Sequence, residues 1–211
     1  MSANSQLALM PFLPGNTLGV TATTDGVEWE GVEFVIPDWD YGLTAGTNVF
    51  KPRTGLTVAP SKTVRCVRNV SGVNLLPGLL VAYQATAAGM GKRVAGYTVT
   101  EAAQGYPVDE FLTSAGVVNN DIFLITVHGN ASIKLSVTAA ETVISAGSYI
   151  MAVTAAASTH STTAGRYIAA ALTGATAVLA NQVVNIVGMA LSASTTADTG
   201  RLSLCFVRRT W

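Results

Sequence analysis

The chain has 211 residues, and its twelve lysines and arginines balance its twelve aspartates and glutamates. Charged residues make up 11% of the sequence and hydrophobic residues 49%, whereas about 25% of an ordinary soluble domain is charged. This composition excludes intrinsic disorder, and the isoelectric point near 6.7 excludes the bulk basic charge of a typical nucleic-acid-binding protein.

The charges are distributed unevenly along the chain. Residues 1–50 hold no lysine or arginine but six acidic residues, namely Asp25, Glu28, Glu30, Glu33, Asp38 and Asp40. From Lys51 onward the net charge is +6. This asymmetry indicates contact between the two parts, within one chain or between neighbouring copies, and an acidic solvated edge explains it equally well.

Residues 1–60 are predicted to form an extended N-terminal arm. They contain five of the seven prolines, and proline cannot donate to a strand ladder, so the centre of a sheet is disfavoured here. Val27–Ile36 is the best candidate for a short strand. Burying a large apolar side chain is worth about 1.5–3 kcal/mol, so we expect the apolar residues of the arm to contact a partner protein. These residues are Leu7, Leu9, Phe12, Leu13, Trp29, Phe34 and Trp39.

Residues 61–211 are predicted to form an all-β body, either a small barrel or a sandwich. Short runs of β-branched and apolar residues recur, separated by glycine, proline and asparagine. Asp121–Val137 predicts a hairpin that turns at His128-Gly129-Asn130. Arg201–Val207 predicts a last strand, and the residues after it suit either a subunit contact or a frayed terminus. The candidates for that contact are Arg208, Arg209 and Trp211.

Several turns are predicted to lead directly into strands. Pro77-Gly78 and Ala146-Gly147 each precede an apolar run, and glycine supplies the positive φ that many turns require. Gly165–Leu172 and Thr176–Gln182 permit either a short helix or a strand. The body therefore reads as predominantly strand.

No metal, cofactor or membrane segment is predicted. Cys66 and Cys205 lie in strand-like runs without metal-ligand spacing, which favours buried, reduced thiols. No apolar run approaches the roughly 20 residues of a spanning helix. The apolar stretch near the N-terminus is interrupted by Pro11 and Pro14 and follows no positive residue, so we expect a protein made and kept in a cytosol.

Catalytic patterns are weak. The acidic residues of the arm include a potential carboxylate pair for glycoside hydrolysis, but they lie outside the body, where a pocket would form. His128 and His160 are predicted in surface loops, without a nucleophile motif nearby. Gly89–Arg93 lacks the spacing of a phosphate-binding loop and predicts a tight turn. We therefore expect a protein that is not an enzyme.

Part of the body resembles the small β-barrel domains of capsid decoration proteins, or head cement proteins, of tailed bacteriophages. The resemblance starts at Arg68–Val81, RNVSGVNLLPGLLV, where a strand, an Asn/Ser/Gly turn and a Pro-Gly lead into an apolar strand. Later parts are Val118–Asp121, Ile144–Gly147 and Val187–Leu191. The similarity covers roughly residues 65–211, and the acidic arm is absent from the smallest members of that class.

The resemblance implies a mechanical function. Such a protein binds the outside of an icosahedral shell and bridges subunits of the major capsid protein, with the arm reaching across neighbouring capsomers. It implies a homotrimer, with a dimer as the alternative, located on the virion after assembly in the host cytoplasm. It implies no catalytic residue, cofactor or nucleic-acid partner.

Two other classes of function fit a β-rich chain with little charge. A tail-fibre or adhesin module would bind a host glycan, usually through aromatic residues clustered on one surface. The three tryptophans lie near the termini instead, which favours contacts between subunits. A small β-sandwich hydrolase using the acidic residues is the remaining alternative.

Overall fold

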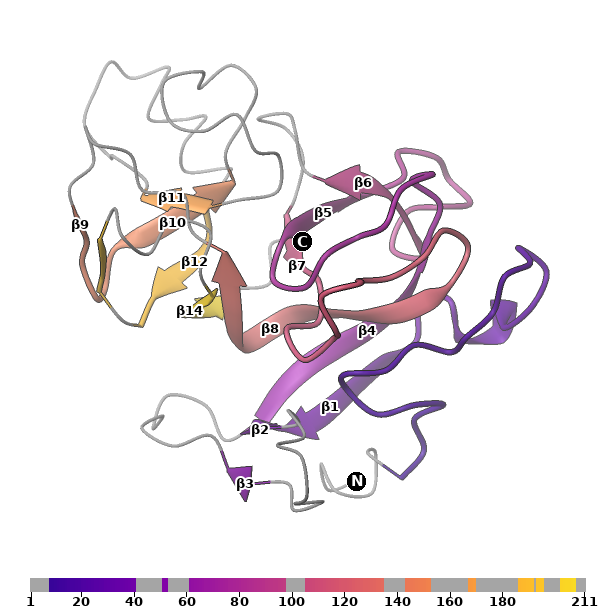
Figure 1. The fold of residues 1–211 in the computed structure, drawn as a ribbon, viewed down its shortest axis with the longest axis horizontal. Coiled ribbons are helices and arrows are strands. Elements are labelled where there is room, and N and C mark those ends of the chain that lie inside the picture. The colour runs from indigo at the N-terminus through magenta and orange to yellow at the C-terminus, as the bar shows by residue number, and fades with distance from the viewer. Residues whose placement is uncertain are drawn as a thin grey trace.

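The computed structural model describes residues 8–40, 51–52, 61–97, 105–134, 143–152, 167–169, 186–191, 193–195 and 202–207. These residues form β-strands and one 3₁₀ turn, so the all-β class is confirmed (Figure 1). The elements are η1 (Val27–Trp29), β1 (Glu33–Pro37), β2 (Trp39–Asp40), β3 (Lys51–Pro52), β4 (Ser61–Asn69), β5 (Leu80–Tyr83), β6 (Arg93–Tyr97), β7 (Tyr106–Pro107), β8 (Ile122–Lys134), β9 (Val143–Ile144), β10 (Tyr149–Ala152), β11 (Tyr167–Ala169), β12 (Ile186–Ala190), β13 (Ser194–Thr195) and β14 (Leu202–Val207).

The long strand β8 joins two groups of strands. Its first half pairs with β4, and its second half pairs with β14 (Figure 1). Within the described residues the strand order of the main sheet is β11-β10-β12-β14-β8-β4-β6-β5-β7. Val108, just after β7, forms a bridge with Ile125 of β8, and the Asp109 amide donates to the Leu124 carbonyl at 3.0 Å. The strands β8, β4, β6, β5 and β7 therefore curl into a small barrel, which the contact of residues 108–109 with β8 closes.

The predicted hairpin turn at residues 128–130 is wrong. Strand β8 continues through this point, because its pairing with β4 ends at His128 and its pairing with β14 begins at Gly129. Gly129 has φ 108°, and a Cβ there would lie 2.7 Å from the Lys62 Cβ. Glycine therefore bends the strand between its two partners, where the sequence pattern alone suggests a reversal. His128 is exposed on this strand.

Both faces of the strand pair β4 and β8 are covered. Phe123 and Ile125 point into the barrel, where they pack with Val67 in an apolar cluster that we call the barrel core. Ile122 and Leu124 point to the other face, in a cluster that we call the outer core. The run Ile122–Val127 is buried throughout, as expected for a strand covered on both faces. A third cluster, around Ile133 and Cys205, lies under β10, β12 and β14.

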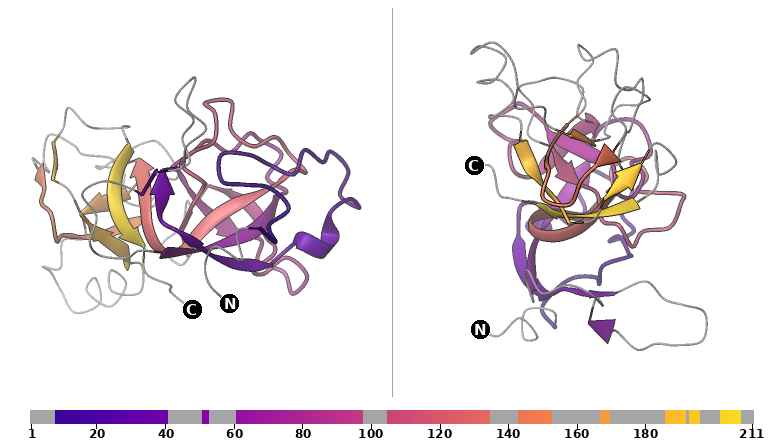
Figure 2. Two further views of the ribbon diagram at one scale, coloured as in Figure 1. Left: turned by 90° about the horizontal axis from the view of Figure 1, so that it is seen from below. Right: turned by 90° about the vertical axis from the view of Figure 1, so that its left-hand side faces the viewer.

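The N-terminal segment, defined here as residues 8–40, covers the outer core. Its strand β1 lies beside β4 and pairs with it in antiparallel direction (Figure 2). Phe34 and Ile36 of β1 lie in the outer core. The predicted strand over residues 27–36 is wrong in its first half. Residues 27–29 form η1, Gly31 has φ 88°, and the strand β1 begins at Glu33. The boundary that the sequence predicts at residue 60 stays a prediction.

The other local predictions have mixed outcomes. Gly78 and Gly147 have positive φ and precede β5 and β10, and Gly89–Arg93 forms the turn before β6, so these turns are confirmed. The segment Gly165–Leu172, for which the sequence permits either a short helix or a strand, contains strand β11. Thr176–Gln182 lies outside the described residues.

Both cysteines are buried and free of disulfide bonds, as predicted. Cys66 lies in the outer core and Cys205 in the third cluster. Cys66 pairs with Leu124 of β8, and Cys205 pairs with Ala131 of the same strand. The two cysteines therefore lie beside positions of β8 that are seven residues apart. Burial raises the pKa of both thiols, that of Cys66 from 9.0 to about 12.

Native Cys66 is expected to react far more slowly with thiol reagents than the unfolded chain. At a given pH below 9 the folded protein holds about a thousandfold less Cys66 thiolate, and the thiolate is the reacting form. The stability that this neutral thiol contributes is intact below pH 9 and is lost as the pH rises from 9 toward 12. The rate of Cys66 modification by a thiol reagent, measured with and without urea on the Cys205→Ser variant, tests this prediction. Equal rates in both conditions would contradict the burial of Cys66.

Candidate functional site

The N-terminal segment is joined to the barrel by an ion-pair cluster around Glu30. Glu30 follows η1, and its side chain is 3% exposed. Its Oε1 accepts from Nε of Arg68 at 2.5 Å, and its Oε2 accepts from Nε of Arg93 at 2.9 Å. Arg68 is on β4 and Arg93 on β6, and the two positions lie side by side in the parallel register. One carboxylate therefore connects the N-terminal segment to two strands of the barrel.

Arg68 is the central residue of this cluster. Its side chain is 0% exposed. Besides Glu30, the guanidinium donates from Nη1 to the carbonyls of Ala22 at 3.1 Å and Asn120 at 2.6 Å, and from Nη2 to the carbonyl of Asp25. An arginine has five donors in a planar fork and suits such multiple recognition. Arg68 thus holds two loops that are distant in sequence, one with Ala22 and Asp25 and one with Asn120, in one arrangement.

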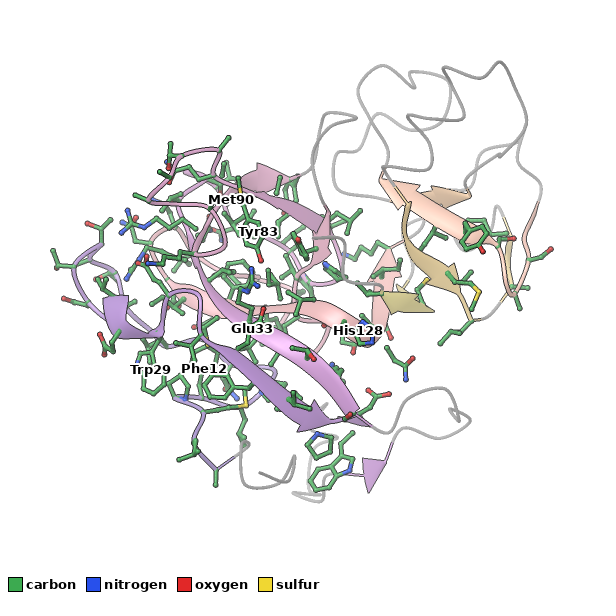
Figure 3. All side chains as sticks on the ribbon, turned by 180° about the vertical axis from the view of Figure 1, so that it is seen from behind. Phe12, Trp29, Glu33, Tyr83, Met90 and His128 are labelled. Carbon is green, nitrogen blue, oxygen red and sulfur yellow. The ribbon has the colours of Figure 1, made fainter. Side chains whose placement is uncertain are left out.

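A second ion pair joins β1 to β4. Glu33 and Arg65 are directly opposite each other in the antiparallel register. Nε of Arg65 donates to Oε1 of Glu33 at 2.9 Å, and Nη1 donates to the Tyr83 hydroxyl at 2.6 Å. Burial raises the pKa of Tyr83, so the hydroxyl stays neutral. Figure 3 labels Glu33 and Tyr83 on the two sides of this contact.

Two aspartates of the body bind the backbone of the N-terminal segment. Asp121 Oδ1 accepts from the amides of Gly19 at 2.8 Å and Val20 at 3.0 Å. Asp109 Oδ2 accepts from the amide of Gly15 at 2.6 Å. Burial raises the pKa of Asp109, and Lys62 and the amide donors act against that rise. These carboxylates satisfy amides that no strand partner reaches.

A further buried polar cluster lies where β4 and β8 separate. Nζ of Lys62 is 3.2 Å from Oε1 of Glu110, and both side chains are almost fully buried. The other oxygen of Glu110 accepts from the amide of Ser132, and Asn130 donates to Asp38 at 2.8 Å. The cluster fills the bend of β8 with hydrogen-bonded polar groups, which is a structural role.

The predicted partner-binding residues differ in how deeply the structure buries them. Phe34 is buried in the outer core, and Phe12, Trp29 and Trp39 pack against it (Figure 3). Leu13 is partly buried, and Leu9 is 58% exposed. Leu7, Arg208, Arg209 and Trp211 lie outside the described residues. Much of the apolar surface of the N-terminal segment therefore contacts its own body, and partner binding by these residues stays a prediction.

Most of the acidic residues that the sequence offers as catalytic candidates have structural partners in the described part of the chain. Glu30, Glu33 and Asp38 are each bonded as given above, and Glu28 is exposed on η1. His160 lies outside the described residues. Among the residues that the structure describes, no group of three or more histidine, cysteine, aspartate or glutamate side chains is arranged to hold a metal ion. In the same part of the chain, no helix is both long enough and apolar enough to cross a membrane.

Sequence reasoning missed the roles of Arg68 and Asn69. Both belong to the motif RNVSG, and both are 0% exposed. The available signal was a charged and a polar residue in the apolar run of β4, in a chain with few charges. A buried arginine requires partners, and the acids of residues 1–50 were the obvious candidates.

Comparisons with known proteins give little. No protein-family model and no curated protein matches the sequence. Among solved structures, the head fibre gp8.5 N base of bacteriophage phi29 is similar with a TM-score of 0.39 and 11% identity, over 70% of this chain and 94% of that chain. The two chains differ too much for a function to be transferred from one to the other.

Proposed function

We propose that this chain is a structural protein of a bacteriophage virion. In this proposal it binds the outer surface of an icosahedral capsid and stabilises the shell by bridging subunits of the major capsid protein. It acts without a cofactor, catalytic residue, nucleic acid or membrane, and it associates with itself, as a homotrimer or alternatively a dimer. It assembles onto the shell in the host cytoplasm.

The main support is the use that the chain makes of its buried charges. Glu30 and Glu33 bind Arg68, Arg93 and Arg65 of the same chain, where an enzyme would present such groups to a substrate. Together with the closed barrel, these contacts tie the strands and the N-terminal segment into one unit. A unit cross-linked in this way transmits force between attachment points without losing its shape, which is the requirement for a bridge on a pressurised shell.

The resemblance of residues 65–211 to head cement proteins adds to this support. In the structure, the first two residues of that motif, Arg68 and Asn69, each have a structural role. Arg68 holds the N-terminal segment, and the Asn69 side chain accepts from the amide of Ser71 at 3.0 Å, which orders the loop that follows β4. Pro77-Gly78 then leads into β5.

Mass spectrometry of purified virions tests the proposal. We expect many copies of the chain per particle, because affinity for a shell comes from repeated, individually weak contacts. Heads assembled without the chain should release their DNA at a lower temperature than complete heads, and adding the purified protein back should restore the difference. A few copies per particle, with no effect on head stability, would contradict the proposal and favour the fibre or adhesin alternative.

A further inference from the structure

Three loops meet at one end of the molecule, and we call them the end loops. They are residues 19–28, which include part of η1, residues 70–74 after β4, and residues 113–120 before β8. This end lies opposite β9, β10 and β11 (Figures 1 and 2). Most of these loop residues are exposed, yet their backbones are connected by hydrogen bonds between segments far apart in the sequence.

Asn69 fixes two of the end loops. Its side chain is buried, and its Nδ2 donates to the carbonyls of Val73 at 2.8 Å, Val117 at 3.0 Å and Val118 at 3.2 Å. The Gly72 amide adds a bond of 3.0 Å to Oδ1 of Asn119. A loop with these bonds loses little conformational freedom when it binds a partner.

Asn120 and Arg68 fix the remaining end loop. Nδ2 of Asn120 donates to the Thr21 carbonyl at 3.1 Å, and Arg68 bonds both Ala22 and Asn120. Asn120 has φ 71°, and no other non-glycine residue in the described part of the chain has a positive φ. Such a backbone conformation is unfavourable and persists where surrounding contacts require it. The Asn120 amide also donates to the Asn69 carbonyl at 2.7 Å, so contacts with β4 hold Asn120 and its loop in this conformation.

The surface that these loops present is apolar and weakly acidic. Val73, Val118 and Val27 are 53%, 47% and 46% exposed. The other residues of the end loops are mostly threonine, serine, alanine, glycine and asparagine, and the exposed charges of these loops are Asp25 and Glu28. Depletion of charge around exposed apolar side chains is typical of the centre of a protein interface.

We propose that the end loops form the face by which this chain docks onto another protein subunit of the shell. The proposal rests on the proposed function and names the site that performs it. The partner surface has an apolar patch that receives Val73 and Val118, and a lysine or arginine that faces Asp25 and Glu28. A second copy of this chain docked through the same face is the less suitable occupant, because the end loops hold no lysine or arginine that would face Asp25 and Glu28.

Binding of the full-length protein to heads assembled without it tests this face. The double variant Val73→Glu with Val118→Glu should bind about tenfold more weakly or worse, as for central interface residues. Charge reversal by Asp25→Lys with Glu28→Lys should also weaken binding, and Asp25→Asn with Glu28→Gln should weaken it less. Tyr149→Glu is the matched control, because Tyr149 is 49% exposed on β10 at the opposite end and should bind as wild type does.

The outcomes separate this inference from the proposed function. The melting temperature of each variant should equal that of the wild type, because the exchanged side chains are exposed. If the wild-type protein binds heads and the end-loop variants bind equally well, the docking face is overturned and the proposed function stays intact. Complete failure of the wild-type protein to bind heads would overturn both. Concentration-dependent dimerisation that the valine variants abolish would assign the face to a second copy and overturn the proposed occupant.

Discussion

Replacing Arg68 with methionine is expected to lower the free energy of unfolding by about 3–5 kcal/mol, the range seen when one partner of a buried ion pair is removed. Methionine fills much of the same space but donates no hydrogen bond, so the carbonyls of Ala22, Asp25 and Asn120 lose their hydrogen bonds from Arg68. A loss of this size is a large part of the roughly 5–15 kcal/mol that stabilises a typical domain. Urea denaturation followed by tryptophan fluorescence measures it.

Arg93→Met is the matched control for Arg68→Met. It removes the same charge from the same carboxylate, but the Arg93 side chain is 31% exposed and its described bond is to Glu30 alone. We expect a loss of about 1 kcal/mol or less, as for exposed ion pairs. Equal losses for the two variants would contradict the central role of Arg68. In Arg68→Met the Glu30 carboxylate keeps its bond to Arg93, so we expect the lost hydrogen bonds to the carbonyls of Ala22, Asp25 and Asn120 to contribute most of the loss.

The sequence predicts the class of the fold and many of its turns, because both depend on local patterns. Strand residues alternate or run as apolar stretches, and Gly78 and Gly147 mark turns by their backbone freedom. Local pattern fails at Gly129, where the same backbone freedom bends a strand that continues on a new partner. Whether a glycine marks a turn or a bend depends on which strands are adjacent in the sheet, and a single sequence does not reveal this.

The candidate site was predicted only as a charge asymmetry. The sequence shows an acidic segment and a basic body, and the structure shows the pairs Glu30–Arg68, Glu30–Arg93 and Glu33–Arg65 within one chain. The pairing of Glu33 with Arg65 follows from strand register, which depends on how β1 lies against β4. The carbonyl contacts of Arg68 follow from loops that are distant in sequence. Residue types therefore indicate that partners exist, and long-range packing decides which partners they are.

Deleting residues 1–60 is expected to abolish cooperative folding of the remaining chain. Phe34 and Ile36 fill the outer core, and burying two such side chains is worth about 3–6 kcal/mol. Their removal also exposes Val64 and Leu124 and leaves Arg68 without Glu30. Thermal unfolding and near-ultraviolet circular dichroism of residues 61–211 measure the effect, and supplying residues 1–60 as a separate polypeptide should restore the native signal.

The opposite result would give the N-terminal segment a different role. If residues 61–211 unfold cooperatively near the wild-type midpoint, the barrel is an autonomous body and the segment is the detachable arm that the proline-rich sequence predicts. The arm would then be free to exchange between copies, with Glu30 pairing Arg68 of a neighbour. If the truncated chain fails to fold, the acidic segment completes the outer core of its own chain. We then expect binding to the shell to depend on surfaces that stay exposed in the intact chain, such as the end loops.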